Sequence, residues 1–188
     1  MNRLMYFGQV LVLAAFSFGC GQRIHFQELP LGLSHDTALI SHTAVRENVV
    51  AAIKPVTLLF FGYTRCPDFC PMTLHKLQAA VGEDEKLKEN LRLIFISVDP
   101  KHDNPAELKN YLSAFPYARG YVPGEDELRA VEKAFGAFSK QERATISHSL
   151  YLYLLNSKGR VIHLIRSDAA VADLRKVMRQ ALETRPGA

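Results

Sequence analysis

The strongest constraint on the fold of this chain is an uninterrupted apolar run that leads into a cysteine-bearing turn. Residues 56–61 carry only β-branched, aliphatic and aromatic side chains, a pattern typical of a strand buried on both faces. A turn at 62–68 follows, and from 69 to 81 the apolar residues recur at helical spacing. A strand buried on both faces belongs inside a sheet that helices cover on each side.

The rest of the chain continues the alternation of strands and helices. The order β-α-β-α-α-β-β-α predicts an α/β protein with a thioredoxin-like fold, in which helices flank a central mixed β-sheet. The elements expected after the first helix are a strand at 91–98, helices beginning near 104 and 125, strands at 150–155 and 161–165 joined by a turn, and a last helix capped by Ser167 and Asp168.

Length and composition are those of one globular domain. The chain has 188 residues, of which 48% are hydrophobic and 22% are charged, so a packed core is expected. The net charge of +4 is too small and too scattered to indicate a nucleic-acid partner. We expect a loose lead-in at 21–54 with a short helix at 45–53, the folded domain at 55–183, and a frayed tail at 184–188.

The N-terminus has the layout of a secretory signal peptide, predicted at 1–19. Arg3 is followed by an apolar stretch at 10–16 and by small residues up to Gly19 and Cys20. Cys20 resembles the acylated cysteine of bacterial lipoproteins, although Ser17 stands where that motif usually has Leu. A plain signal peptide or anchor and a buried core cysteine are the alternatives. We therefore expect a membrane-anchored protein of the bacterial cell envelope, facing the periplasm or the outer side of the inner membrane.

Two closely spaced cysteines follow the first buried strand. Cys66 and Cys70 lie at the start of the predicted helix, where the helix dipole and free backbone N–H groups lower the pKa of a thiol. If both cysteines are helical, a spacing of four places them on one helix face, with Cα atoms about 6 Å apart. Either a disulfide or one metal ion fits that distance, so a redox pair and a metal site both remain open.

A histidine before the third predicted strand favours the metal alternative. Thioredoxin-like reductases usually have CxxC facing a cis-proline, whereas this chain has CxxxC and His148. Two thiolates suit Cu(I), and an added imidazole also accommodates Cu(II). Asp99 ends a buried strand at the same edge of the sheet. We expect it either to support the ligands from behind or to cap a turn. The remaining histidines have weaker claims. Surface positions are expected for His25, His35, His42 and His75, whereas His102 lies in the loop after Asp99 and His163 alternates within a strand.

These motifs together resemble the SCO/SenC family of copper proteins. The matching segments are LFFGYTRCPDFCP at 59–71, ISVDPKHDNP at 96–105, and His148 followed by Ser149 and an apolar strand. The resemblance covers about 55–182. It implies a thioredoxin fold that binds one copper through Cys66, Cys70 and His148, and delivers it to the CuA-bearing subunit of cytochrome c oxidase, with other copper chaperones or a thioredoxin-like reductant as further partners.

The chain departs from the family pattern in two places. Ser147 stands where the family usually has Asp before its ligand histidine, which weakens the expectation of strong Cu(II) binding. The segment before Pro55 is expected to lack most of the family's opening hairpin.

A copper chaperone, which turns nothing over, is the first functional hypothesis. The alternative is an exported thiol–disulfide oxidoreductase that reduces the CuA cysteines, or a peroxidase, with Cys66 attacking and Cys70 resolving. Loss of the histidine separates the two classes, because a reductase tolerates it. A docking scaffold without a working site is the third and weakest hypothesis.

Overall fold

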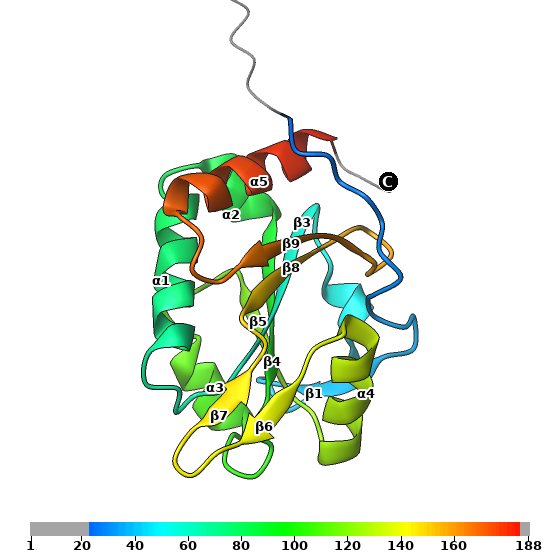
Figure 1. Cartoon of the computed structure of the whole chain (residues 1–188), viewed down its shortest axis with the longest axis vertical. Helices are drawn as coiled ribbons and strands as arrows, with labels where there is room; N and C mark the ends of the chain where they lie inside the picture. The colour runs from blue at the N-terminus through cyan, green and yellow to red at the C-terminus, as the bar shows by residue number, and fades with distance from the viewer. Residues whose placement is uncertain (1–22, 185–188) are drawn as a thin grey trace, which may run out of the picture.

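A seven-stranded mixed sheet forms the centre of the molecule (Figure 1). The computed structural model describes residues 23–184, so the predicted leader, Cys20 and the end of the tail lie outside the described residues. The strands are β1 (Ala38–Ser41), β2 (Arg46–Asn48), β3 (Val56–Gly62), β4 (Leu91–Ser97), β5 (Ala118–Val122), β8 (Tyr151–Leu155) and β9 (Val161–Arg166), and β6 (Ser139–Gln141) with β7 (Ile146–His148) form a separate hairpin.

The sheet order is β2-β1-β5-β4-β3-β8-β9. Strands β3, β4 and β5 run parallel, whereas β8 pairs antiparallel with β3, and β1 pairs antiparallel with β5. The expected α/β class, with a thioredoxin-like fold and a mixed sheet flanked by helices, is therefore confirmed. The helices are α1 (Phe69–Val81), α2 (Glu85–Asn90), α3 (Pro105–Tyr111), α4 (Glu125–Phe135) and α5 (Val171–Thr184).

Alternating side chains of β3 hold helices on its two faces. Phe61 contacts Phe135 of α4, and the ring centroids are 5.8 Å apart. Phe60 points to the other face and contacts Phe95, which in turn meets Tyr111 of α3. Because every residue of β3 is buried, both faces of this strand need a helix layer.

Several short elements differ from the expectation. The segment 45–53 forms β2 and a single 3₁₀ turn instead of a helix, and β1 with β2 supplies an opening hairpin that the sequence was expected largely to lack. β5 was not predicted because Arg119 and Gly120 interrupt its apolar pattern. Its pairing with β4 and β1, rather than its local sequence, makes this segment a strand. α2 and the β6–β7 hairpin were also missed. Among the described residues, no helix is long and apolar enough to cross a membrane.

Candidate metal centre

The two cysteines and the histidine predicted as ligands meet at one end of the sheet. Cys66 lies in the turn after β3, Cys70 lies in the first turn of α1, and His148 ends β7. Figure 1 shows the β6–β7 hairpin at the same end of the molecule as the start of α1. Cys70 is fully buried and His148 is 7% exposed, whereas Cys66 is half-buried. Cys66 is therefore the most accessible of the three predicted ligands.

The three ligand atoms lie close enough to share one metal ion. They are all within 4.8 Å of one another. The Cys70 thiol lies 3.6 Å from Nε2 of His148, and the backbone N–H of Cys70 donates to Sγ of Cys66 at 3.4 Å. Both cysteines are free thiols in this structure. Cys66 lies in the turn before α1 and only Cys70 is helical, so the turn and the first helical turn together bring the two sulfur atoms close. The expectation that both lie on one helix face is therefore wrong.

Contacts around the imidazole fix which nitrogen faces the thiols. Nδ1 of His148 lies 3.1 Å from the carbonyl oxygen of Ser149, so Nδ1 carries the proton and donates. The lone pair of Nε2 is then directed at the sulfur atoms, which is the tautomer that a metal ligand requires. The rings of Phe60 and Tyr63 meet the imidazole edge-on, with centroids 6.0 Å from its own, and they exclude water from that side.

The surroundings make the two thiols electrostatically unequal. Hydrogen bonding with the Cys70 thiol lowers the pKa of Cys66 to about 4, against the opposing effect of burial, and nearby backbone N–H groups act in the same direction. The hydrogen bond with Cys66 and burial raise the pKa of Cys70 above its usual range. At neutral pH the pair therefore holds one thiolate and one thiol, and a metal must displace the proton on Cys70.

Two residues at the end of β3 set the distance between the turn and the hairpin. The hydroxyl of Tyr63 accepts a hydrogen bond from the backbone N–H of Ile146 at 3.2 Å, which ties β7 to the turn. At Gly62, an added Cβ would lie 2.7 Å from the Phe95 ring and 3.0 Å from Sγ of Cys70. Only glycine leaves the Cys70 sulfur its place beside the strand.

Two aspartates after β4 hold the cysteine turn from behind. Asp99 accepts from Nη2 of Arg65 at 2.8 Å and contacts Nδ1 of His102 at 2.7 Å. Burial opposes ionisation of Asp99, but Arg65 and His102 together hold its pKa below the usual range. Asp99 thus contacts the neighbour of Cys66 and does not contact any of the three ligands in the described hydrogen bonds.

Asp103 is the residue that sequence reasoning missed. Its buried carboxylate accepts from the hydroxyl of Thr64 at 2.6 Å, from the backbone N–H of Thr64, and from the hydroxyl of Ser97 at 2.6 Å. It joins the end of β4 to the turn that carries Cys66. The signal available was its place four residues after Asp99 in the second matching segment.

The hairpin places Ser147 on the side of β7 that faces solvent. The burial pattern of β7 is buried, exposed, buried, as expected for alternating strand residues. The side chain of Ser147 therefore points away from the site that His148 enters. An acidic side chain at this position would extend from the outer face of the hairpin.

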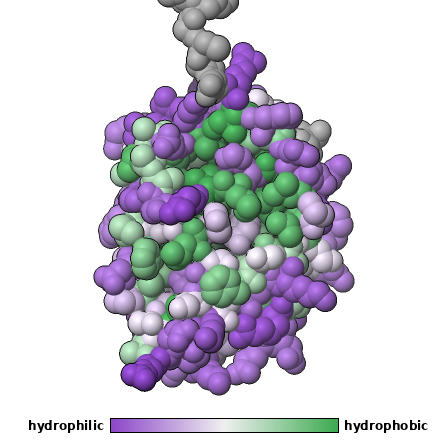
Figure 2. Space-filling model, in the orientation of Figure 1, coloured by the Kyte–Doolittle hydropathy of each residue, from purple (hydrophilic) through white to green (hydrophobic). Residues whose placement is uncertain are grey.

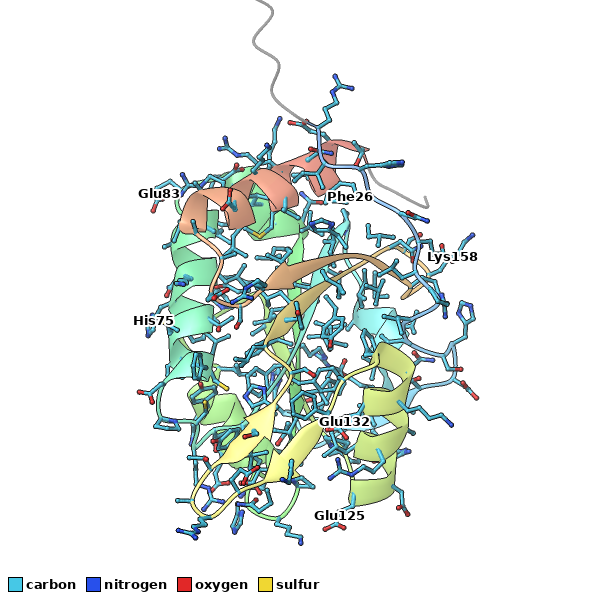
Figure 3. The ribbon with its side chains drawn as sticks, viewed as in Figure 1. Phe26, His75, Glu83, Glu125, Glu132 and Lys158 are labelled. Carbon is cyan, nitrogen blue, oxygen red and sulfur yellow. The ribbon has the colours of Figure 1, made fainter. Side chains whose placement is uncertain are left out.

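Most of the other histidines lie outside the site. His75 projects from the outer side of α1 (Figure 3), with its ring against Phe115. His163 packs against Phe26. His42 was expected at the surface, but it is half-buried, and its Nδ1 accepts the backbone N–H of Gly120 at 2.8 Å. His42 is therefore a structural contact between the opening hairpin and β5.

Two soft sulfur donors and one imidazole define the chemistry of this centre. Such a donor set favours soft or borderline metal ions over Mg²⁺ and Ca²⁺. Without a metal, a thiolate beside a buried thiol at a helix start also has the arrangement of a dithiol redox pair. The fold and the site thus define a thioredoxin-like protein with a Cys-Cys-His centre.

The chain belongs to the SCO1/SenC family, whose model matches residues 38–183. A protein of Stutzerimonas stutzeri whose name describes it as copper-binding is 33% identical over 135 residues, covering 67% of this chain and 65% of that protein. This chain thus aligns with slightly less than two thirds of the length of that relative.

Solved structures of the family have the same fold. ScoI of Bradyrhizobium japonicum with copper bound has a TM-score of 0.70 and 28% identity, covering 81% of this chain and 99% of that one. ScoI of Arabidopsis thaliana with copper bound has a TM-score of 0.73 and 26% identity, covering 82% and 99%. The match to the family model begins at residue 38, so the matched region includes the β1–β2 hairpin.

Proposed function

We propose that this protein binds one copper ion through Cys66, Cys70 and His148 and delivers it during assembly of cytochrome c oxidase. The observation that carries the proposal is the convergence of two sulfur atoms and an imidazole nitrogen within 4.8 Å of one another. Two structures that this chain resembles were solved with copper bound. Copper is here the cargo of the protein and not a catalyst.

The residues present fit Cu(I) in particular. A soft ion prefers thiolate ligands, and Cys66 supplies one thiolate without any change of protonation at neutral pH. The Nε2 lone pair of His148 is held toward the sulfur atoms by the Ser149 carbonyl. Imidazole coordination also accommodates Cu(II).

Delivery by ligand exchange is consistent with the unequal exposure of the two sulfur atoms. Cys66 is half-buried and Cys70 is fully buried. A thiolate of the recipient approaches from the Cys66 side while Cys70 and His148 still hold the ion. We propose the CuA-bearing subunit of the oxidase as recipient, on the family resemblance of the three motifs.

Reduction of a partner disulfide is the second candidate function, favoured by the low pKa of Cys66. The Cys66 thiolate would attack one sulfur of the partner disulfide to form a mixed disulfide, and Cys70, once deprotonated, would displace it. The Cys66–Cys70 pair loses two electrons and forms a disulfide. The partner gains the two electrons and leaves as two thiols, taking one proton from Cys70 and one from solvent. The disulfide of the CuA cysteines is the substrate we assign to this reaction.

An anaerobic competition titration with Cu(I) tests the chaperone proposal. The reduced protein and the variants Cys66→Ala, Cys70→Ala and His148→Ala are titrated against a chelator of known affinity. We expect one tight site per chain that all three substitutions weaken at least tenfold. The matched control is His75→Ala, which removes an exposed imidazole from the outer side of α1 and leaves the affinity unchanged.

The same variants distinguish the two candidate functions. Copper binding that is indifferent to His148→Ala contradicts the three-ligand centre. Reduction of a disulfide substrate by His148→Ala at the wild-type rate, combined with weak copper binding by the unmodified protein, would favour the reductase. Peroxide consumption dependent on Cys66 would instead indicate a peroxidase.

We also propose export and attachment to the outer side of the inner membrane through acylation of Cys20. The order of charge, apolar stretch and small residues in 1–20 supports this proposal. Mass spectrometry of the N-terminal peptide from membrane fractions tests it. An unmodified Cys20, or a chain that retains Met1, would contradict it.

A further inference from the structure

A basic groove lies along α5, away from the metal centre. It has a volume of about 680 Å³, and its lining includes Arg23, Arg175, Lys176, Arg179, Gln180 and Glu183. Four cationic side chains thus face one carboxylate. Figure 2 shows hydrophilic side chains around this end of the molecule, where the described chain begins.

Two of the four cations are free to meet an external anion. Within residues 23–184, no carboxylate lies within ion-pair distance of Arg23 or Lys176, and both side chains are exposed. Arg179 pairs with Asp84 at 2.8 Å and still has 57% of its side chain exposed. Arg175 donates to the carbonyl oxygens of Ala79 and Ala80 at 2.8 Å each. Arg175 therefore braces the groove, and the other three cations face outward.

The groove adjoins the point where the N-terminal segment enters the fold. The backbone N–H of Ile24 donates to the Gln180 side chain at 2.8 Å, and the Gln180 amide donates back to the Ile24 carbonyl. These bonds fasten the start of the described chain to α5. Cys20 precedes Arg23 by three residues, a span of at most about 10 Å. A lipid attached to Cys20 would thus hold the groove close to the membrane surface.

The metal centre lies at the opposite end of α1 from this groove. Arg175 bonds to carbonyl groups near the C-terminal end of α1, whereas Cys70 lies in its first turn. Ten residues of helix separate Cys70 from Ala80, which is a rise of about 15 Å. Figure 1 shows α5 and the beginning of the described chain at one end of the long axis, and the β6–β7 hairpin at the other.

We infer that the α5 groove is a docking surface for the headgroups of anionic phospholipids. Membrane-bound phosphates would pair with Arg23, Lys176 and Arg179, since Lys and Arg near an anionic leaflet are attracted to it. Docking through this end directs the Cys66, Cys70 and His148 centre away from the bilayer, toward the domain of a partner that projects from the membrane. The inference rests on the proposed acylation of Cys20 and not on copper binding.

Residue-resolved amine labelling tests this inference on the full-length chain. The protein is mixed with vesicles of phosphatidylcholine alone or with 30% phosphatidylglycerol, and initial rates of lysine acetylation are measured by mass spectrometry. We expect the phosphatidylglycerol vesicles to slow labelling of Lys176 about tenfold, and 0.5 M salt to restore it. Lys140, which is exposed on the β6–β7 hairpin, is the internal control and should label equally on both vesicles.

Two charge variants and one measurement with free phosphate complete the design. Arg23→Gln should reduce the protection of Lys176 several-fold, whereas Arg143→Gln, the same change in the exposed β6–β7 turn, should leave it intact. Equal labelling of Lys176 on both vesicles overturns the inference, and so does equal protection of Lys140. Protection by 10 mM inorganic phosphate without vesicles would also overturn it, because the groove would then be a site for free phosphate.

Discussion

At the scale of single residues, the site depends on an asymmetry between two cysteines four positions apart. Cys66 lies in the turn before α1, and its Sγ accepts a hydrogen bond from the backbone N–H of Cys70. Cys70 itself is enclosed between α1, β3 and His148. The same pair of thiols therefore provides one accessible thiolate and one protected donor. This arrangement is compatible with both a copper carrier and a dithiol reductant.

The reactivity of Cys66 should follow a pKa far below that of an ordinary thiol. We expect its alkylation by iodoacetamide to rise with an apparent pKa of about 4, and Cys70 to stay unreactive up to pH 9. Because the folded pKa of Cys66 is below its unfolded value of 9.0, its contribution to stability is full above pH 9 and is lost as the pH falls toward 4. Peptide mapping of protein alkylated at each pH measures the reactivity of Cys66. A midpoint of alkylation above pH 7 would contradict the low pKa.

Ser147 provides a test of how far the strand register isolates the site. Since the 147 side chain faces solvent, we expect Ser147→Asp to change Cu(I) and Cu(II) affinity less than threefold. Chelator competition for Cu(I) and spectral titration for Cu(II) measure this, with His148→Ala as the comparison that lowers both. A tenfold gain for Cu(II) would show that the hairpin turns position 147 toward the metal.

At the scale of secondary-structure elements, two separate supports bring the ligands together. Asp103 joins the cysteine turn to the end of β4 through Thr64 and Ser97. Tyr63 joins the same turn to β7 through the backbone of Ile146. The hairpin that carries His148 pairs with no strand of the main sheet, so the Tyr63 bond is important for its position.

Removal of the Tyr63 hydroxyl should loosen the position of the β6–β7 hairpin that carries His148. We expect Tyr63→Phe to lower Cu(I) affinity about three- to tenfold, since a buried N–H loses its acceptor and a hydrogen bond contributes about 0.5–1.5 kcal/mol. Tyr151→Phe, which alters an exposed tyrosine on β8, is the matched control and should have no effect. Wild-type affinity in Tyr63→Phe would show that packing alone holds β7.

At the scale of the whole molecule, one axis relates the site to the surface proposed to face the membrane. The helix α1 runs between them, with Cys70 at its start and the α5 contacts at its end. The ligands come from two distant parts of the chain, so a bound metal cross-links the turn after β3 to the β6–β7 hairpin. Metal binding should therefore stabilise the entire fold.

Copper removal should lower the melting temperature of the domain. At a free ion concentration one hundred times the dissociation constant, binding adds about 2.7 kcal/mol, or about 5–10 °C for a domain of this size. Differential scanning calorimetry of the reduced protein with and without Cu(I) measures the shift. Cys66→Ala should show a smaller shift, and an equal shift in both proteins would indicate binding elsewhere.

The sequence alone determined the central strands, the main helices and the three residues proposed as ligands. Buried strands such as β3 and β4 are readable because uninterrupted apolar runs are rare outside a covered sheet. The cysteine pair is readable because its chemistry follows from local spacing at a helix start. His148 was found through its place before an apolar strand and through family resemblance.

Tertiary structure alone decided the features that depend on contacts distant in sequence. β5 and the opening hairpin have weak local patterns and are specified by pairing partners elsewhere in the chain. The roles of Asp103 and Tyr63 became visible only when the turn, β4 and β7 were placed side by side. The basic groove likewise brings Arg23, near the start of the described chain, next to side chains of α5 near its end. Local sequence encodes strand burial and ligand chemistry, whereas long-range packing fixes the distances between ligands and the direction in which the site faces.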